Sequence, residues 1–297
     1  MNNIKKIFYI IIVLLTSTFC LWVYFVHPKT QAVCQKKSYF HTLEQLIKVK
    51  QKSFDGDFSF FVKDFSFPQL ELSFQSEEKI AAASIIKLPI LAVMMRAVKE
   101  NKFSLDDEII IKRKDITGGS GKIKGMKIPI KLTLRKILEL MITRSDNTAT
   151  NKVIDLLGYD YINNDFTQLG LTDTFLKRKM MDFSLRSKGV ENYTTARDIT
   201  LLFEKLYTKK LVDKSSSELM ISLLKKQKVN NRIPRFLPEG VIVAHKTGLE
   251  RGVVHDAGIV FNEKGDYIIC VLVNKVKNFN NAKKLIAQLS LLTYNLY

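Results

Sequence analysis

The sequence predicts an α+β protein, a three-layer αβα sandwich in which an antiparallel five-stranded sheet is flanked by the terminal helices and carries an inserted all-helical sub-domain. Three observations predict this fold. Strand-like segments fall in two separate blocks, residues 57–74 and 240–275, and helical periodicity dominates between and outside them. Strands from the two blocks can pair in one antiparallel sheet. The length of 297 residues allows one large core or two coupled sub-domains.

The first 33 residues are typical of a targeting segment. Two lysines precede an uncharged run from Ile7 to Val26, which suits the core of a signal peptide or an uncleaved membrane anchor. The small residues that end at Ala32 fit a cleavage site. We expect residues 1–33 to be a signal peptide or anchor. The rest of the chain is then exported, to the periplasm or another extracytoplasmic space, either free or anchored to the inner membrane.

The remaining elements follow in chain order. Apolar residues at helical spacing predict a helix at 38–52, and β-forming residues then predict a hairpin of strands at 57–65 and 69–74. A short strand is expected within 104–116, and a loop at 117–125. The other expected helices are 84–101, 133–146 with Thr133 as its cap, 147–158, 160–171, 194–211, 215–227 and 281–297, and the later strands are 240–248, 253–262 and 267–275.

This order divides the exported chain into two parts. Residues 38–83 and 209–297 form the predicted α/β sub-domain, and residues 84–208 form the predicted helical sub-domain. A site for a small molecule is expected in the cleft between them.

Composition and cysteine usage exclude several functions. The formal net charge is +18, but the lysines are spread over almost every segment with little arginine or aromatic interleaving, which favours a solvated basic surface over a nucleic-acid groove. The four histidines are scattered and have no metal-ligand spacing, so we expect no metal and no cofactor. Cys34 and Cys270 either form one disulfide in an oxidising compartment or remain free thiols.

The stretch Ser84-Ile85-Ile86-Lys87 pairs a hydroxyl with an amine at the start of a strongly apolar helix. Lys87 lies one turn after Ser84 and therefore on the same face. An apolar setting disfavours the charged form of the amine, so Lys87 could accept the proton of Ser84. Alone, a serine three residues before a lysine is more often an ordinary helical turn.

Two later motifs favour a catalytic role for Ser84 and Lys87 over an ordinary helical turn. Arg144-Ser145-Asp146-Asn147 stands where one predicted helix gives way to the next, and His245-Lys246-Thr247-Gly248 ends a predicted strand. Each has a structural explanation, a helix cap for the first and a strand end for the second. Functionally, Ser145 could relay a proton and Asn147 could bind a substrate amide. Lys246 could face a substrate carboxylate, while Gly248 would let a substrate lie against the strand.

The three motifs occur in the order S-x-x-K, S-D-N and K-T-G, and the chain therefore resembles the class A β-lactamases and penicillin-binding proteins. The resemblance covers roughly residues 38–297. It implies that Ser84 is a nucleophile that forms an acyl-enzyme with a β-lactam or a peptidoglycan-like amide. It further implies that Lys87 and Ser145 transfer protons, that Asn147, Lys246 and Thr247 bind substrate, and that the backbone amides of Ser84 and Leu249 hold the oxyanion.

The chain departs from that family at two places. Class A enzymes hydrolyse the acyl-enzyme with a loop glutamate in an E-x-x-L-N stretch, and residues 176–200 contain no such stretch. Alignment by counting places Lys179, Met181 or Asp182 there, and Asp182 is either a catalytic base or a carboxylate that anchors the loop. Leu249 follows K-T-G where many members carry serine or threonine, which leaves Thr247, Lys246 or Arg251 to bind the substrate carboxylate.

Three functions remain open at this point. The first is a hydrolase of the β-lactamase type. The second is a penicillin-binding protein, D-alanyl peptidase or β-lactam sensor that is acylated but deacylates slowly. A non-catalytic envelope protein is the third, and the intact motifs argue against it. No nucleic-acid partner is expected, and a monomer is the default.

Overall fold

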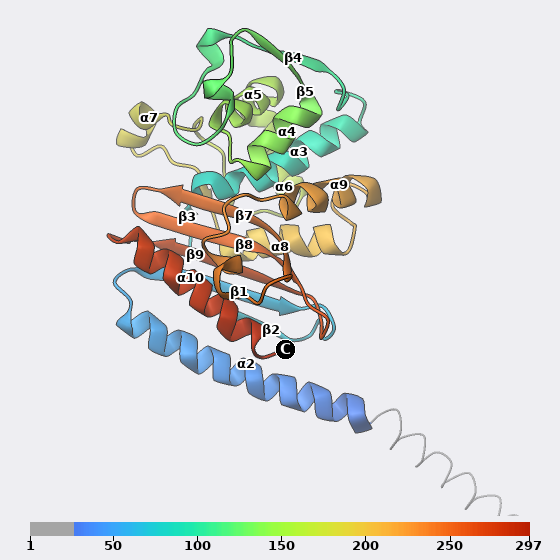
Figure 1. The fold of residues 1–297 in the computed structure, drawn as a ribbon, viewed down its shortest axis with the longest axis vertical. Helices are drawn as coiled ribbons and strands as arrows, with labels where there is room; N and C mark the ends of the chain where they lie inside the picture. The colour runs from blue at the N-terminus through green and yellow to red at the C-terminus, as the bar shows by residue number, and fades with distance from the viewer. Residues whose placement is uncertain (1–26) are drawn as a thin grey trace, which may run out of the picture.

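A computed structural model of the protein describes residues 27–297, and it has three layers with a helical part beside them (Figure 1). The central sheet has the strand order β2-β1-β9-β8-β7, with every neighbouring pair antiparallel. The sheet therefore combines the first block of strands with the last. Its strands are β1 (Asp57–Asp64), β2 (Glu71–Phe74), β7 (Ile242–Glu250), β8 (Val253–Phe261) and β9 (Tyr267–Asn274).

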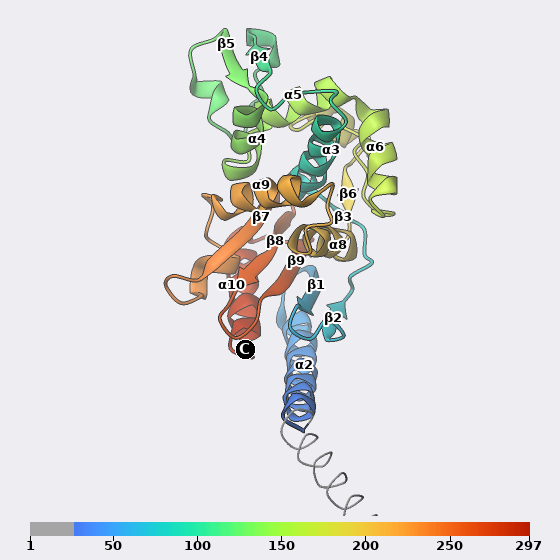
Figure 2. The same cartoon turned by 90° about the vertical axis from the view of Figure 1, so that its right-hand side faces the viewer.

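The two terminal helices cover one face of the sheet. Helix α2 (His27–Ser53) places Phe40, Leu43 and Ile47 against that face, at the three- and four-residue spacing of a buried helical stripe. Helix α10 (Phe279–Tyr294) packs beside α2 and contacts β8 and β9. Seen after a quarter turn, α10 and α8 (Ala196–Tyr207) lie on opposite sides of the sheet (Figure 2).

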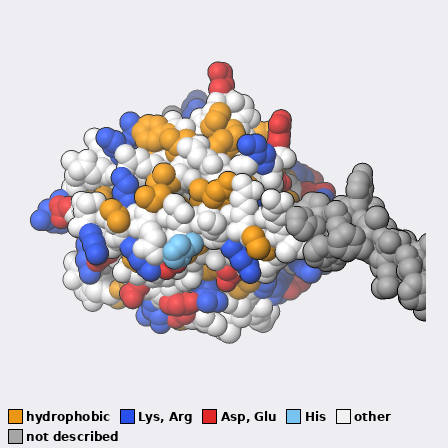
Figure 3. Space-filling model, turned by 90° about the horizontal axis from the view of Figure 1, so that it is seen from below, with side chains coloured by type: hydrophobic (Ala, Val, Ile, Leu, Met, Phe, Trp, Pro, Cys, Tyr) orange, Lys and Arg blue, Asp and Glu red, His pale blue; other side chains and the backbone are white. Residues whose placement is uncertain are grey.

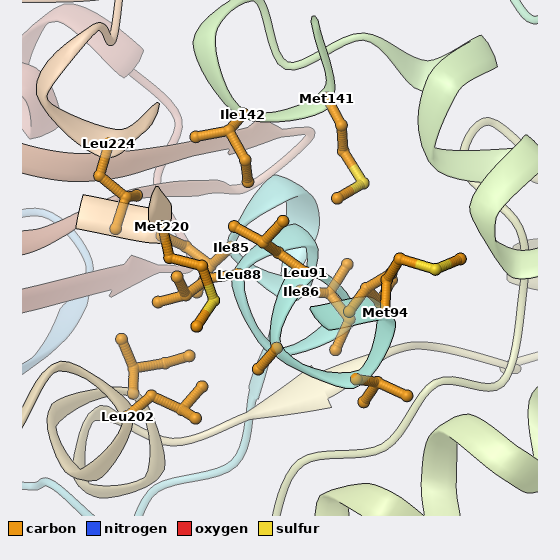
Figure 4. Close-up of a cluster of buried hydrophobic side chains, with 14 of the residues drawn as sticks. Ile85, Ile86, Leu88, Leu91, Met94, Met141, Ile142, Leu202, Met220 and Leu224 are labelled. Atoms are coloured by element: carbon orange, nitrogen blue, oxygen red, sulfur yellow. The ribbon is translucent and has the colours of Figure 1, made fainter. Parts of the chain in front are cut away.

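The other face of the sheet joins the helical part through one continuous core. Helix α8 packs on β1, β8 and β9, and α9 (Lys214–Lys225) packs on β7. Helices α3 (Lys87–Lys99) and α4 (Leu134–Thr143) add their apolar faces. Figure 4 shows side chains from these helices and from the 3-10 turn before α3 (Ala83–Ile86) in one cluster, among them Ile85, Leu88, Met141, Leu202 and Met220, all of which are buried. Edge strand β7 thus lies closest to the helical part.

The remaining helical part is built from α5 (Asn147–Leu157), α6 (Tyr159–Gln168) and the short α7 (Phe183–Ser187). Two small sheets complete it: β3 (Ile80–Ala81) pairs with β6 (Tyr193–Thr194), and β4 (Glu108–Ile111) pairs with β5 (Ile130–Thr133).

The predicted fold class is confirmed, and most predicted elements are present. Thr133 caps α4 as expected, because its hydroxyl accepts a hydrogen bond from the Lys136 amide. Strands β3, β5 and β6 and helix α7 have no clear pattern in the sequence, because they are short and depend on partners distant in the chain. Helix α8, which the predicted division assigns to the helical sub-domain, packs on β1, β8 and β9 of the sheet.

The predicted signal peptide or anchor at 1–33 falls almost wholly outside the described residues, and its last residues, 27–33, lie in α2. Within residues 27–297, no helix has the length and apolar character needed to cross a bilayer. Both described cysteines are free thiols: Cys34 is exposed on α2, and Cys270 is buried in β9.

Basic side chains are dispersed over the face of the molecule that Figure 3 shows, which is the lower side in Figure 1. Lysine and arginine side chains alternate there with acidic and uncharged ones, and no continuous basic stripe crosses this face. Its pattern agrees with the solvated surface that the sequence predicts.

His255 is buried between the layers and should make stability depend on pH. Its Nε2 donates to the Ala81 carbonyl at 2.8 Å, and its Nδ1 accepts from the Val273 amide at 3.1 Å, so the ring fits only in its neutral form. Burial, and to a lesser degree the charge of Arg232, lowers the pKa of His255 to about 4. The contribution of neutral His255 to the free energy of unfolding is therefore fully present above the unfolded-state pKa near 6.5, and it is lost as the pH falls towards 4.

We predict that lowering the pH from 7 to 4 reduces the free energy of unfolding by about 3 kcal/mol more in the wild type than in His255→Gln. The reason is that the folded wild type needs His255 to be neutral, whereas the unfolded chain binds a proton there. Urea unfolding at both pH values measures the difference. Equal losses in the two proteins would contradict the assignment.

Candidate active site

Ser84 lies in a short 3-10 turn, η2 (Ala83–Ile86), that leads directly into α3. Its neighbours Ala83, Ile85 and Ile86 are buried, whereas Ser84 is only partly buried and lines a cavity. Ala83 has a φ of +44°, a conformation that a residue with a Cβ rarely adopts. The turn therefore holds the hydroxyl at the cavity surface while the residues around it are packed.

Lys87 is the first residue of α3, and its ammonium group is fully buried. Nζ lies 2.7 Å from the Ser145 carbonyl, 2.8 Å from Asn147 Oδ1 and 3.1 Å from Ser145 Oγ. Burial first, and then the charge of Lys246, holds the pKa of Lys87 well below its ordinary value, against the opposing effect of Asp146. A neutral Lys87 keeps two N–H donors for the two carbonyl-type oxygens and can accept a hydrogen bond from the Ser145 hydroxyl.

Ser145 lies between the two buried lysines. Its Oγ is 3.1 Å from Nζ of Lys87 and 3.1 Å from Nζ of Lys246. Ser145 has a φ of +51°, so this position too is held in an unfavourable backbone conformation by the groups around it. A hydroxyl placed between two amines can pass a proton from either of them to a bound molecule.

Asp146 fixes the turn that carries Ser145 and Asn147. Its Oδ1 accepts from the Ala149 amide and caps α5, and its Oδ2 accepts from the amides of Lys122 and Ile123. The cap that the sequence predicts as an alternative is thus present at Asp146, while the functional candidates are its two neighbours. One carboxylate joins helix α5 to the loop before β5.

The glycine-rich residues 117–121, part of the loop predicted at 117–125, form one wall of the site. Asn147 donates through Nδ2 to the Gly118 carbonyl at 2.9 Å and through its backbone amide to the Ser120 carbonyl at 3.0 Å. A Cβ on Gly119 would lie 2.7 Å from Asn147 Nδ2, and one on Gly121 would overlap the Asp146 carboxyl group. The glycines therefore allow the loop to approach the motif closely.

Strand β7 brings the third motif to the same place. Nζ of Lys246 is fully buried and donates to the Thr247 carbonyl at 2.7 Å as well as to Ser145. Burial, followed by the charge of Arg232, lowers the pKa of Lys246 to about 7, although Asp256 opposes this. Gly248 does not line the cavity: a Cβ there would lie 3.0 Å from the His255 ring and 3.2 Å from Ile85. Its role in this structure is to let β7 pack against η2.

Arg232 is a further cation of the site that the analysis of the sequence missed. It is 2% exposed, and its Nε and Nη1 have no hydrogen-bond partner among the described residues. The amide of the next residue, Ile233, donates to Asp256 of β8 at 3.0 Å, and Asp256 pairs with Thr247. The positive charge of Arg232 acts on both Lys246 and His255. No sequence motif marks Arg232, which stands 14 residues before Lys246.

The cavity over Ser84 has a volume of about 1040 Å³, at the upper end of the range for ligand pockets. Its lining comes from η2, the loop 117–121, the loop before and within α7, and the end of β7. Leu249 lines it and is 46% exposed, so this apolar side chain faces the cavity where a hydroxyl was expected from the family pattern.

Met180, rather than Lys179 or Asp182, is the loop residue fixed over the site. Asn151 donates to the Met180 carbonyl at 3.1 Å and accepts from its amide at 2.8 Å, and Met180 lines the cavity. Lys179 instead pairs with Asp155. Asp182 caps α7 by accepting from the Leu185 amide at 2.9 Å, and it does not line the cavity. This geometry favours the loop-anchoring role of Asp182 over the catalytic one.

An ion-pair network ties the α7 loop to the end of β7. The buried guanidinium of Arg178 contacts Glu191 at 2.7 Å and Glu250 at 2.9 Å, and Arg186 lies 3.4 Å from Glu191 and 2.9 Å from Glu250. Two arginines and two glutamates thus balance one another. Glu250 is the only carboxylate among the residues that line the cavity, all of which belong to the described part of the chain, and both of its oxygens are engaged by Arg178.

The structure brings most of the predicted residues together. Lys87, Ser145, Asn147 and Lys246 form one hydrogen-bonded cluster, and Thr247 joins it through its carbonyl. Ser84, Asn147 and Leu249 line the adjoining cavity. The other predicted residues do not line it: Lys87, Ser145, Asp182, Lys246, Thr247 and Gly248. In residues 27–297, no group of histidine, cysteine and carboxylate side chains has an arrangement that could hold a metal ion.

Comparisons with known proteins agree with this arrangement. A family model described as the beta-lactamase enzyme family matches residues 41–297. A beta-lactamase of Phocaeicola vulgatus is 28% identical over 193 residues, which is 56% of this chain and 57% of that protein. The beta-lactamase VEB-1 of Pseudomonas aeruginosa is 24% identical over 230 residues, which is 72% of this chain and 77% of VEB-1. The chain thus spans just over half the length of the Phocaeicola relative.

Solved structures of beta-lactamases and of PBP-A are also similar to this chain. The crystal structure of a beta-lactamase from Sphaerobacter thermophilus superposes with a TM-score of 0.78 at 28% identity, over 83% of this chain and 92% of that one. The structure of PBP-A superposes with a TM-score of 0.79 at 28% identity, over 86% and 95%. A point mutant of PBP-A, solved as an acyl-enzyme complex with penicillin G, has a TM-score of 0.79 at 27% identity, over 87% and 96%.

The contact of Gly121 with Asp146 generates a prediction about stability. We expect Gly121→Ala to lower the free energy of unfolding by about 3 kcal/mol, because the new Cβ overlaps the Asp146 carboxyl group and the backbone φ is +129°. Gly118→Ala, in the same loop, is the matched control, since nothing lies within 4 Å of its Cβ. Chemical denaturation measures both. Equal effects of the two substitutions would show that the loop does not depend on this contact.

Proposed function

The chain belongs to the beta-lactamase enzyme family, and we propose that it is an exported serine hydrolase of this family, acylated on Ser84 by a β-lactam or a related peptide amide and slow to release the acyl group. The observation that best supports acylation of Ser84 is that the three motifs come together at one place. Ser145 Oγ lies 3.1 Å from the amines of both Lys87 and Lys246, beside a cavity that Ser84 lines. The nucleophile and the proton acceptor come from one segment, the proton relay comes from a second, and Lys246 comes from a third.

Acylation begins when Ser84 Oγ attacks the carbonyl carbon of the amide. The hydroxyl proton passes to the neutral amine of Lys87, whose lowered pKa makes it an acceptor near neutral pH. The negative charge on the carbonyl oxygen is held by the backbone amides of Ser84 and Leu249. The C–N bond then breaks, Ser145 gives its proton to the leaving nitrogen, and Ser145 regains a proton from Lys87. An ester on Ser84 remains.

Recognition uses the amide and the carboxylate of the substrate. The Asn147 side chain, fixed by Gly118 and Lys87, presents its amide to the cavity. Lys246 and Thr247 face the substrate carboxylate, and the buried charge of Arg232 adds to their attraction. Arg232 does not line the cavity, so its charge acts on the substrate carboxylate from behind the strand that carries Lys246.

Slow deacylation follows from the loop. A base for hydrolysis must reach a water beside the ester, and base catalysis is worth about 10²–10⁴ in rate. Met180 and Met181 line the cavity at the loop, and the one lining carboxylate, Glu250, is paired with arginines. The acyl-enzyme complex of the PBP-A mutant shows that a protein of this fold can be observed in the acylated state. These facts favour a penicillin-binding or sensing role over rapid β-lactam hydrolysis.

Export and a monomeric state remain parts of this proposal. They rest on the charge pattern and apolar run at the N-terminus and on the small-molecule site within one chain.

The test is a time course of intact mass on the exported part mixed with excess benzylpenicillin, with Ser84→Ala as control. We expect one adduct of penicillin mass on the wild type that persists for hours, and none on the variant. An adduct that disappears as penicillin is consumed would refute slow deacylation. Failure to form any adduct would refute the proposed acylation of Ser84.

Met180→Glu should shorten the lifetime of the acyl-enzyme. A carboxylate at Met180 would stand on a loop that Asn151 fixes over the cavity, where it can activate a water. We expect deacylation at least tenfold faster than in the wild type, measured by the decay of the adduct mass after penicillinase removes free penicillin. Met180→Gln matches the size without the base, and an equal acceleration in that variant would contradict the proposal.

The pH dependence of acylation follows from Lys246. With a pKa of about 7, its ammonium is charged below pH 7 and loses its charge above it, so attraction of the substrate carboxylate weakens as pH rises. We expect the second-order rate of acylation by benzylpenicillin to fall above about pH 7. Lys246→Arg keeps its charge and should move that fall to higher pH, whatever its absolute rate. A wild-type rate that keeps rising to pH 9 would be inconsistent with this role.

A further inference from the structure

A second cavity, separate from the one over Ser84, lies beside the end of α4. The two cavities have no lining residue in common. Helix α4 and Arg144, which follows it, line the second cavity together with Lys226 and Lys228, which follow α9, and with Lys122. Its volume is about 290 Å³, just under the range of sites for drug-sized ligands, so a small ligand would fill it.

The lining of this second cavity is strongly basic. Glu139 is the only carboxylate among the lining residues, all of which lie in the described part of the chain, and it pairs with Lys136 at 3.0 Å. The side chains of the other lining cations make no ion pair or hydrogen bond within residues 27–297: Lys122, Arg144, Lys226 and Lys228. Four positive charges are therefore unbalanced around one small space, whereas acidic and basic side chains alternate on the face in Figure 3.

The ends of the neighbouring helices do not account for these cations. Lysines that follow a helix often interact with its last carbonyl groups. At the end of α4, however, the Ile142 carbonyl accepts from Gln227 Nε2 at 3.1 Å, and the Thr143 carbonyl accepts from the backbone amide of Lys228 at 3.2 Å. These carbonyls need no lysine side chain. The same two bonds fix the segment after α9 to α4, which holds the backbone of the cationic residues in place before a ligand binds.

Arg144 indicates which anion suits the cavity. Its side chain is partly buried, and its backbone amide is bound to the Leu140 carbonyl at 3.1 Å. A guanidinium group is planar and binds two oxygens of one phosphoryl group at once, while lysine ammonium groups bind phosphate as point charges. Two phosphoryl groups carry about three to four negative charges near neutral pH, which matches the four unbalanced cations.

We propose that the second cavity binds a small ligand that carries a diphosphate group. Arg144 binds one phosphoryl group through its guanidinium, and the lysine side chains from the loop and from the segment after α9 surround the other. The site is distinct from the catalytic centre and does not depend on the proposed acylation of Ser84.

Titration calorimetry of the full chain with inorganic pyrophosphate, in low salt without divalent metal ions, tests the proposal. We expect one pyrophosphate per chain, bound at least tenfold more tightly than orthophosphate, because the second phosphoryl group adds charge-assisted hydrogen bonds. The affinity should fall as the salt concentration rises. Absence of binding, or equal affinities for pyrophosphate and orthophosphate, would overturn the proposal.

Substitutions locate the bound anion. We expect Arg144→Gln and Lys228→Gln each to weaken pyrophosphate binding at least fivefold. Lys228 is exposed, so its variant keeps the test valid if Arg144→Gln does not fold. Lys127→Gln is the matched control, since it removes an exposed lysine that lines neither cavity, and it should keep the wild-type affinity. An equal loss in Lys127→Gln would reveal general attraction to a basic surface and would refute a defined site.

The catalytic centre offers pyrophosphate an alternative site, because Lys246 and Arg232 are also cationic groups. We expect Lys246→Gln to keep the affinity for pyrophosphate within twofold of the wild type. A loss of binding in Lys246→Gln, with none in Lys228→Gln, would place the anion in the catalytic centre and contradict the proposal. None of these measurements depends on acylation, so their outcome is independent of the test with benzylpenicillin.

Discussion

Two buried ammonium groups that share one hydroxyl are the constraint on which the rest of this structure depends. Lys87 and Lys246 are both fully buried, and Ser145 Oγ lies 3.1 Å from each. Like charges in a low-dielectric interior repel strongly, and burial alone already disfavours each of them. The favourable response is for Lys87 to be neutral, which is the state that a proton acceptor for Ser84 requires. The packing around the two lysines therefore favours the state of Lys87 that the proposed acylation requires.

The surrounding elements serve to hold these groups at that separation. Asp146 joins the turn of Ser145 to helix α5 and to the loop before β5, and Gly248 lets strand β7 approach the turn that carries Ser84. Ala83 and Ser145 adopt positive φ values that only a well-packed environment can maintain. The site thus lies where the sheet meets the helical part, and neither part contains it alone. The apolar core shown in Figure 4 fixes the position of the helical part relative to the sheet.

The sequence allowed the fold and the centre of the site to be predicted, because both depend on local patterns. Alternation and helical spacing located the long elements, and the three motifs located Ser84, Lys87, Ser145, Asn147 and Lys246. Groups positioned by distant contacts were not accessible in this way. Met180 is placed by Asn151, 29 residues away, so counting along the loop led to Lys179, Met181 or Asp182 instead. Arg232 matters through its burial beside Lys246, and burial of a single arginine has no local signature.

In the loop and at the end of β7, Glu191 and Glu250 are paired with arginines, which supports the slow deacylation that we propose. All of this depends on the protonation state of the two lysines. The most direct measurement is an NMR titration of the lysine Nζ groups in the folded protein, with Lys87 and Lys246 assigned from single substitutions. The account predicts that Lys246 titrates near pH 7 and that Lys87 titrates far below the ordinary lysine range. Titration of both near pH 10 would contradict it.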